Sequence, residues 1–91
     1  MNSKKEINLH FPIQLDGKKI NKLTMRRPTV RDRLLAAKDE GASPDEVEVK
    51  MFAILMDIPE ENLHDMDLLD YEQCARAVND FLKKPGSQSG T

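Results

Sequence analysis

The segment INLHFPIQLDGKKINKLTMR, residues 7–26, decides the N-terminal half of the fold. Its first part alternates between apolar and polar residues, which is the pattern of a strand with one buried face. Asp16-Gly17 then supplies a two-residue turn, because glycine tolerates positive φ. Lys18–Arg26 is predicted to be the return strand. The residues predicted to face inward from the first strand are Ile7, Leu9, Phe11, Ile13 and Leu15.

Two residues disturb the regularity of this hairpin. Pro12 has no N–H to donate, so it predicts an edge position or a bulge. Ile20 is out of phase with Leu23 and Met25, which predicts a bulge or a break near Asn21-Lys22. A lone hairpin is marginally stable in water, so its apolar face is predicted to lie on helices.

A first helix is predicted to begin after Pro28. Thr29 is a suitable N-cap, and Asp32, three residues later, completes an acidic variant of the capping box. Gly41 is predicted to close the helix in a left-handed conformation. The residues predicted to form its buried stripe are Val30, Leu34, Leu35 and Ala37.

The strongest local signal in the chain is Ser43-Pro44-Asp45-Glu46. Ser caps a second helix, Pro takes the first helical position and Glu completes the capping box. The helix is predicted to end near Asp57, because Pro59 disfavours helical geometry in the residue before it. A single helical turn is predicted at residues 59–63. The residues predicted to be buried on the second helix are Val47, Met51, Phe52, Ile54 and Leu55.

A last helix is predicted to begin at Asp67 and to stop before Pro85-Gly86, with Asp70 near its positive end. Its apolar stripe is predicted to contain Leu68, Tyr71, Ala75, Val78 and Leu82, widened by Cys74 and Phe81. The fold class is therefore α+β: an N-terminal β-hairpin packed on a small bundle of three main helices plus one short helical turn. Residues 1–84 are predicted to be one domain, and residues 85–91 a disordered tail.

The composition argues against most enzyme classes. The chain has 91 residues, 4% aromatics and no Trp, which is thin material for a deep substrate pocket. Its four glycines lie at turns or in the tail, so no phosphate-binding loop is predicted. His10, His64 and Cys74 lie on different elements without metal-ligand spacing. We predict no catalysis, no metal and no cofactor, and Cys74 is interpreted as a buried structural thiol.

The apolar runs are too short for a membrane span, and no signal peptide is evident at the N-terminus. These observations predict a cytoplasmic protein without a membrane partner.

The net charge of −2 hides a strong asymmetry. Residues 1–38 contain ten Lys and Arg against three Asp and Glu, whereas residues 39–91 contain four against thirteen. The two halves could attract each other within one chain, or the basic end of one copy could bind the acidic end of the next as a homo-oligomer. Nucleic-acid binding is the least favoured explanation, because the acidic half would repel phosphates.

Four arginines gather at the junction between the hairpin and the first helix: Arg26, Arg27, Arg31 and Arg33. They could bind phosphate, but no aromatic residue lies nearby in the sequence to stack on bases. The simpler interpretation is that they face Asp and Glu of the second and fourth helices.

The stretch Leu23–Asp32 resembles the "Leu-Thr-Leu-Arg-x-Pro-Thr-x-x-Asp" segment of small phage tail assembly chaperones, of the type found in Mu-like contractile-tailed phages and prophages. That family also opens with an alternating strand and an Asp-Gly turn, as residues 13–17 do. Ile58–Leu63 and Leu68–Tyr71 are similar to two later family segments. The resemblance extends over residues 7–83, although the basic Arg31 and Arg33 depart from it.

The resemblance implies a chaperone that binds the tape-measure protein during tail assembly in the bacterial host cytoplasm and is absent from the finished virion. The tail tube protein is a second implied partner. Members often occur in two lengths through ribosomal frameshifting, and Lys83-Lys84 is compatible with a slippery site. An adaptable apolar seam is the expected way to cover a helical client. The residues predicted to contact a partner are the four arginines above and Met25, Met51, Met56 and Met66.

Two other functions stay open at this point. One is a small DNA-binding regulator that uses the basic junction between strand and helix. The other is a structural subunit that is retained in the particle.

Overall fold

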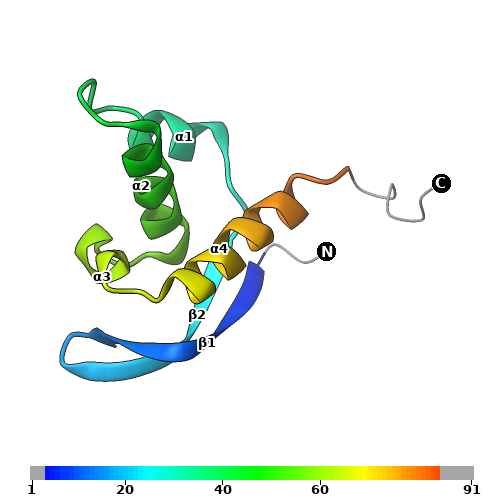
Figure 1. The fold of residues 1–91 in the computed structure, drawn as a ribbon. Helices are drawn as coiled ribbons and strands as arrows, with labels where there is room; N and C mark the ends of the chain where they lie inside the picture. Colours follow the sequence, from blue (N-terminus) through cyan, green and yellow to red (C-terminus); the bar gives the residue numbers. More distant parts are fainter. Residues whose placement is uncertain (1–3, 85–91) are drawn as a thin grey trace.

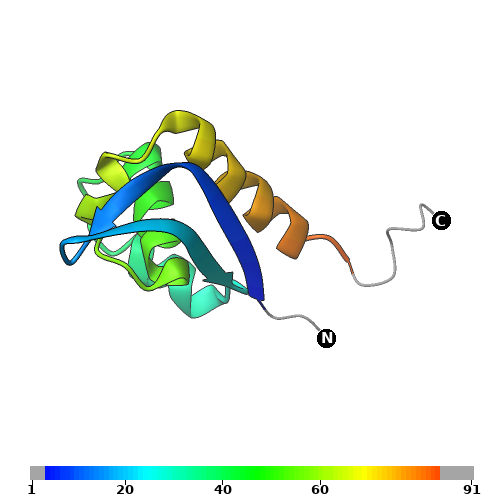
Figure 2. The same ribbon diagram turned by 90° about the horizontal axis from the view of Figure 1, so that it is seen from below.

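The computed structural model describes residues 4–84 and has two layers, a long twisted β-hairpin and a group of helices on one of its faces (Figures 1 and 2). The order along the chain is β1 (Lys4–Leu15), β2 (Lys18–Arg26), α1 (Val30–Ala36), α2 (Pro44–Met56), α3 (Glu60–His64) and α4 (Leu68–Phe81). The predicted α+β class, with three main helices and one short helix, is confirmed.

The hairpin turn is the one predicted from Asp16-Gly17. Both residues have positive φ, 54° and 77°, as a two-residue turn between twisted strands requires. The strands pair antiparallel from Leu15↔Lys18 outward. The register then shifts, because the four β1 residues between Asn8 and Ile13 face the single residue between Ile20 and Lys22. The extra residues form a bulge on β1.

This bulge corrects one prediction. Phe11 was predicted to face inward, but it lies in the bulge and is 53% exposed. The period-two pattern fails here because a bulge adds residues without advancing the pairing. Pro12 lies in the same segment, as its missing N–H predicted, whereas the predicted break in the return strand falls on β1 instead. Ile7, Leu9 and Ile13 are buried as predicted.

Helix α1 is shorter than predicted, and the face that it buries is not the predicted one. It ends at Ala36, and Gly41 does not adopt positive φ. Thr29 and Asp32 form the predicted capping box. The predicted stripe was wrong, because the residues that α1 buries are Asp32 and Ala36. Val30, Leu34 and Leu35 are 75%, 67% and 51% exposed, and Ala37 is also exposed.

Helices α2 and α3 form close to the positions predicted from the sequence. Ser43 and Glu46 form the predicted capping box, and the helix ends at Met56, followed by Asp57 as a left-handed cap with φ of 56°. Leu63 of α3 is buried, as predicted for the short turn. The residues buried on α2 are Phe52, Ala53, Leu55 and Met56, while Val47, Met51 and Ile54 are half-buried.

Helix α4 begins after Asp67, which caps the Leu69 N–H as predicted, and ends at Phe81. Its buried face consists of Asp70, Cys74, Ala77 and Phe81. Leu68 and Leu82 were predicted to be buried but are 71% and 67% exposed. The face that α4 buries therefore coincides only in part with the face on which its apolar residues recur. The predicted tail, residues 85–91, lies outside the described residues.

The core lies between the layers. The side chains of Met25 and Cys74 are fully buried, and they pack with Leu55. The other buried side chains of the core come from both strands, α2, the α3 segment and α4: Ile7, Leu9, Ile13, Leu23, Phe52, Ala53, Met56, Leu63, Met66, Ala77 and Phe81.

Candidate functional site

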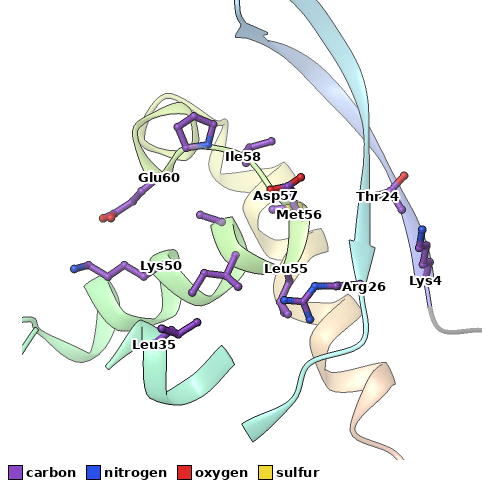
Figure 3. A pocket seen from close by; sticks show the side chains of 13 residues that line it. Lys4, Thr24, Arg26, Leu35, Lys50, Leu55, Met56, Asp57, Ile58 and Glu60 are labelled. Atoms are coloured by element: carbon purple, nitrogen blue, oxygen red, sulfur yellow. The ribbon is translucent and has the colours of Figure 1, made fainter. Parts of the chain in front are cut away.

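A groove of about 980 Å³ lies where the last turns of α2 approach the hairpin and α1 (Figure 3). Its lining comes from five elements and from the three residues that connect α2 to α3: Lys4 of β1, Thr24 and Arg26 of β2, Leu35 of α1, Lys50, Ala53, Ile54, Leu55 and Met56 of α2, the connecting Asp57, Ile58 and Pro59, and Glu60 of α3. No single stretch of sequence forms this site.

The groove has an apolar floor and a charged rim. Leu35, Ile54 and Ile58 keep exposed or half-exposed side chains, although each is a large aliphatic residue. Lys50 and Glu60 stand on the helical side, and Arg26 stands on the hairpin side (Figure 3). An apolar floor with a charged rim suits an amphipathic segment of another protein, which lays its apolar side on the floor.

The rim at the junction of β2 and α1 is held by a bidentate ion pair. Arg26 donates to both carboxylate oxygens of Asp32, at 2.9 and 2.7 Å. The Thr29 N–H and hydroxyl also donate to Asp32, at 2.8 and 3.0 Å. The hydrogen bonds from Arg26 are the main reason that the pKa of Asp32, which is 3% exposed, lies well below its usual range. The same pair raises the pKa of Arg26.

A second carboxylate anchors the bulge of β1 to α4. Asp70 is fully buried and accepts hydrogen bonds from the N–H groups of His10 and Phe11, at 2.9 and 3.0 Å, and from Gln73 at 2.9 Å. The His10 ring lies 3.1 Å away. Burial alone would raise the pKa of Asp70, but these hydrogen bonds outweigh it, so the pKa is lowered. Asp70 lies in the first turn of α4, as predicted, and it is in addition a buried anchor for the β1 bulge.

Acid is therefore expected to destabilise the fold. Asp32 and Asp70 have lowered pKa values when folded, so the unfolded chain takes up their protons first as the pH falls. The stabilisation is complete at neutral pH and should be lost progressively below about pH 5. Urea unfolding measured between pH 7 and pH 3 checks this. A free energy of unfolding that stays constant over that range would contradict it, and changing the exposed Asp65 to Asn should leave the slope unaltered.

The residues predicted to contact a partner do not form one surface. Met25, Met56 and Met66 are at most 8% exposed and belong to the core, which corrects their interpretation as an adaptable surface seam. Met56 contributes to the floor of the groove from below, and Met51 is half-buried. The sequence pattern misled because methionine fills irregular core gaps as readily as it lines partner surfaces.

The four arginines also separate. Arg26 borders the groove, and the Arg27 guanidinium lies 5.9 Å from the centre of the Phe81 ring. Arg31 and Arg33 are exposed on α1. The predicted pairing with acids of the second and fourth helices was wrong, because Arg26 forms its ion pair with Asp32 of α1.

The sequence did not predict that α1 has an exposed apolar face. Val30 and Leu34 are one helical turn apart, and Arg31 and Arg33 lie on either side of them. The available signal was Asp32 six residues after Arg26, because an ion pair between them turns the Asp32 side of this short helix toward the hairpin.

Catalytic and metal chemistry find little support in residues 4–84. No group of three or more His, Cys, Asp or Glu side chains in this part of the chain could hold a metal. Cys74 is fully buried, and burial raises the pKa of its thiol to about 12, so it carries no thiolate at neutral pH. Within the same described range, no helix is long and apolar enough to cross a membrane.

The sequence model of the family described as "Phage tail assembly chaperone proteins, E, or 41 or 14" matches residues 6–83. The chain belongs to this family. The match covers both strands of this tail assembly chaperone almost completely and all four helices, so the α1 face and all of the groove lining except Lys4 lie within the family region. The resemblance seen in the sequence is confirmed. No curated protein and no solved structure matches the chain.

Proposed function

We propose that this tail assembly chaperone binds the tape-measure protein during tail assembly and holds it without catalysis. The observation that carries the proposal is the family match over residues 6–83. The binding unit in this proposal is the predicted domain, residues 1–84. The tail tube protein is proposed as a second partner, and the host cytoplasm as the place where the chaperone acts.

The groove is the proposed client site. A helical client exposes an apolar stripe before its final partner covers it, and a shallow groove can shield such a stripe without enclosing it. Leu35, Ile54 and Ile58 supply the apolar contact. The groove is lined by the cations Lys4, Arg26 and Lys50 and by the acidic Asp57 and Glu60, so it suits a client whose apolar stripe is flanked by charges of both signs.

A pull-down with a matched pair of variants tests the proposal. The tagged chaperone is co-expressed with the neighbouring open reading frames, and the eluted proteins are identified by mass spectrometry. Leu35→Asp introduces a charge into the groove at a side chain that is 51% exposed, so folding should survive. We expect at least tenfold less tape-measure protein to be recovered with this variant than with the wild type. Leu82→Asp, at an exposed leucine outside the groove lining, should retain the client.

Two outcomes of this experiment would contradict the proposal. Equal recovery with Leu35→Asp and Leu82→Asp would remove the groove as the site. Recovery of nucleic acid alone, lost steeply as salt rises, would favour the DNA-binding alternative, because phosphate contacts weaken with salt and apolar contacts do not. Detection of the chain in purified virions would favour a retained structural subunit.

A further inference from the structure

We propose that an extended segment of the client adds to the hairpin as a third strand, paired with the free edge of β2 inside the groove. The inference rests on the proposed function for the identity of the client, and it concerns the conformation in which the client is held. Three observations carry it: the unpaired edge of β2, the position of that edge in the groove, and the basic composition of the strand.

The backbone groups of β2 that face away from β1 can be assigned from the strand pairing. In an antiparallel pair, residues that bond the neighbouring strand alternate with residues whose N–H and C=O point outward. Asn8 of β1 is of the outward kind, because its carbonyl accepts a hydrogen bond from Gln73 of α4 at 2.8 Å. Its partner on β2 is Lys22, which is therefore outward as well. The alternation extends this orientation to Thr24 and Arg26.

The helical layer covers the outer edge of β1 but leaves the outer edge of β2 free. Side chains of α3 and α4 form hydrogen bonds with four backbone groups of β1. The sheet has two strands, and within residues 4–84 no hydrogen bond reaches the outward backbone groups of Lys22, Thr24 or Arg26. A strand edge with free N–H and C=O groups is a template for a further strand.

This free edge forms one wall of the groove. Thr24 and Arg26 belong to the lining, and Figure 3 shows β2 opposite the end of α2. A helix in the groove bonds its own backbone internally, so it would shield the edge from water without pairing it, which is unfavourable. The apolar floor can shield an apolar stripe in either conformation, but only an extended segment also pairs with the edge. Every second side chain of such a segment would point to the floor, where Leu35, Ile54 and Ile58 lie.

The composition of β2 indicates which strand fits beside it. The sequence KKINKLTMR contains four Lys and Arg residues and no Asp or Glu. A second copy of β2 would place like charges side by side, which disfavours pairing between two copies. Acidic side chains of another protein would instead lie beside the exposed Lys22. The occupant is therefore a client segment in which acidic residues, on the outer face, alternate with apolar residues that contact the floor.

Replacing Thr24 by proline tests this pairing in the pull-down. Thr24→Pro removes the outward N–H of an exposed residue and places the ring where the added strand would lie, while the bonds between β1 and β2 do not use this N–H. We expect at least tenfold less tape-measure protein to be recovered than with the wild type. Thr24→Val keeps the N–H and should retain the client.

A second proline variant controls for the effect of proline on the hairpin. Lys19 pairs with Gln14, whose carbonyl also points outward, to Asn62. Lys19→Pro therefore removes an N–H of the same kind, at an exposed residue outside the groove lining, and should retain the client. Circular dichroism of each variant verifies that it is folded.

Hydrogen exchange of the wild type tests the pairing without a substitution. The amides of Lys22, Thr24 and Arg26 should exchange at least tenfold more slowly in the co-purified complex than in the free chaperone, because each acquires an acceptor. Unchanged exchange at these amides would overturn the inference, and so would equal loss of the client by Thr24→Val and Thr24→Pro.

The pull-down also separates failure of the inference from failure of the proposed function. If Leu35→Asp loses the client and Thr24→Pro keeps it, the groove is still the client site and the added strand is wrong. If the wild type recovers no tape-measure protein, the proposed function itself is contradicted.

Discussion

Replacing Asp70 by Asn is expected to lower the free energy of unfolding by about 3 kcal/mol, a large part of the total stability of a domain this small. Asp70 is fully buried, and each of its oxygens accepts at least one N–H. Asparagine keeps one oxygen but turns the other acceptor into an N–H donor, which would then face a donor of the β1 bulge. A buried donor without a partner costs about 1–3 kcal/mol in addition to the lost charge-assisted bonds.

Thermal unfolding measures this effect with a control from the same helix. A loss of about 3 kcal/mol corresponds to a fall in Tm of roughly 15 °C for a domain of this size. Asp67→Asn changes the exposed N-cap of α4 to another good N-cap residue and should shift the Tm by only a few degrees. Equal shifts in the two variants would show that Asp70 does not anchor the bulge. Asp70→Asn should also flatten the acid dependence of stability, because one of the two lowered carboxylates is gone.

Local chemistry explains which parts of the fold were predictable. The Asp16-Gly17 turn, the Thr29 and Ser43 capping boxes and the Asp67 cap each depend on residues at most three positions apart. Their geometry is decided by backbone conformations that few side chains support. These features were found correctly, and with them the order of the six elements.

The rotation of α1 and α4 was not predictable from periodicity. Both helices have apolar residues around more than one side, so several faces compete for burial. Buried carboxylates determine which face of each helix is turned inward. Asp32 binds Arg26, and Asp70 binds backbone N–H groups about sixty residues earlier in the chain. A sequence pattern shows an acidic residue in each first turn but not the partner it will meet.

The groove escaped prediction for a related reason. Its lining comes from residue 4 to residue 60, and only Arg26 and Met56 were among the residues predicted to contact a partner. Methionine fits a partner surface and a core equally well, so the sequence alone does not show which of the two roles each methionine has. The charge asymmetry between the two halves is visible in the sequence, and among residues 4–84 the ion pairs of Lys22 and Arg26 stay within the basic half.

The different positions of Met25 and Met51 give a direct test of this distinction. Met25 is fully buried on the inner face of β2, so Met25→Ala should leave a cavity and lower the free energy of unfolding by about 3 kcal/mol. Met51 is half-buried on α2, where alanine has high helix propensity, so Met51→Ala should cost about 1 kcal/mol or less.

Chemical denaturation of both variants, together with client recovery in the pull-down, separates core packing from partner contact. A core residue changes stability, and recovery of the client by the folded fraction stays as in the wild type. A surface contact changes recovery while stability is nearly preserved. If Met25→Ala were as stable as the wild type and lost the client, Met25 would have to reach the surface when the client binds. The hairpin would then have to move away from the helices, because a side chain with no exposed area cannot otherwise touch another protein.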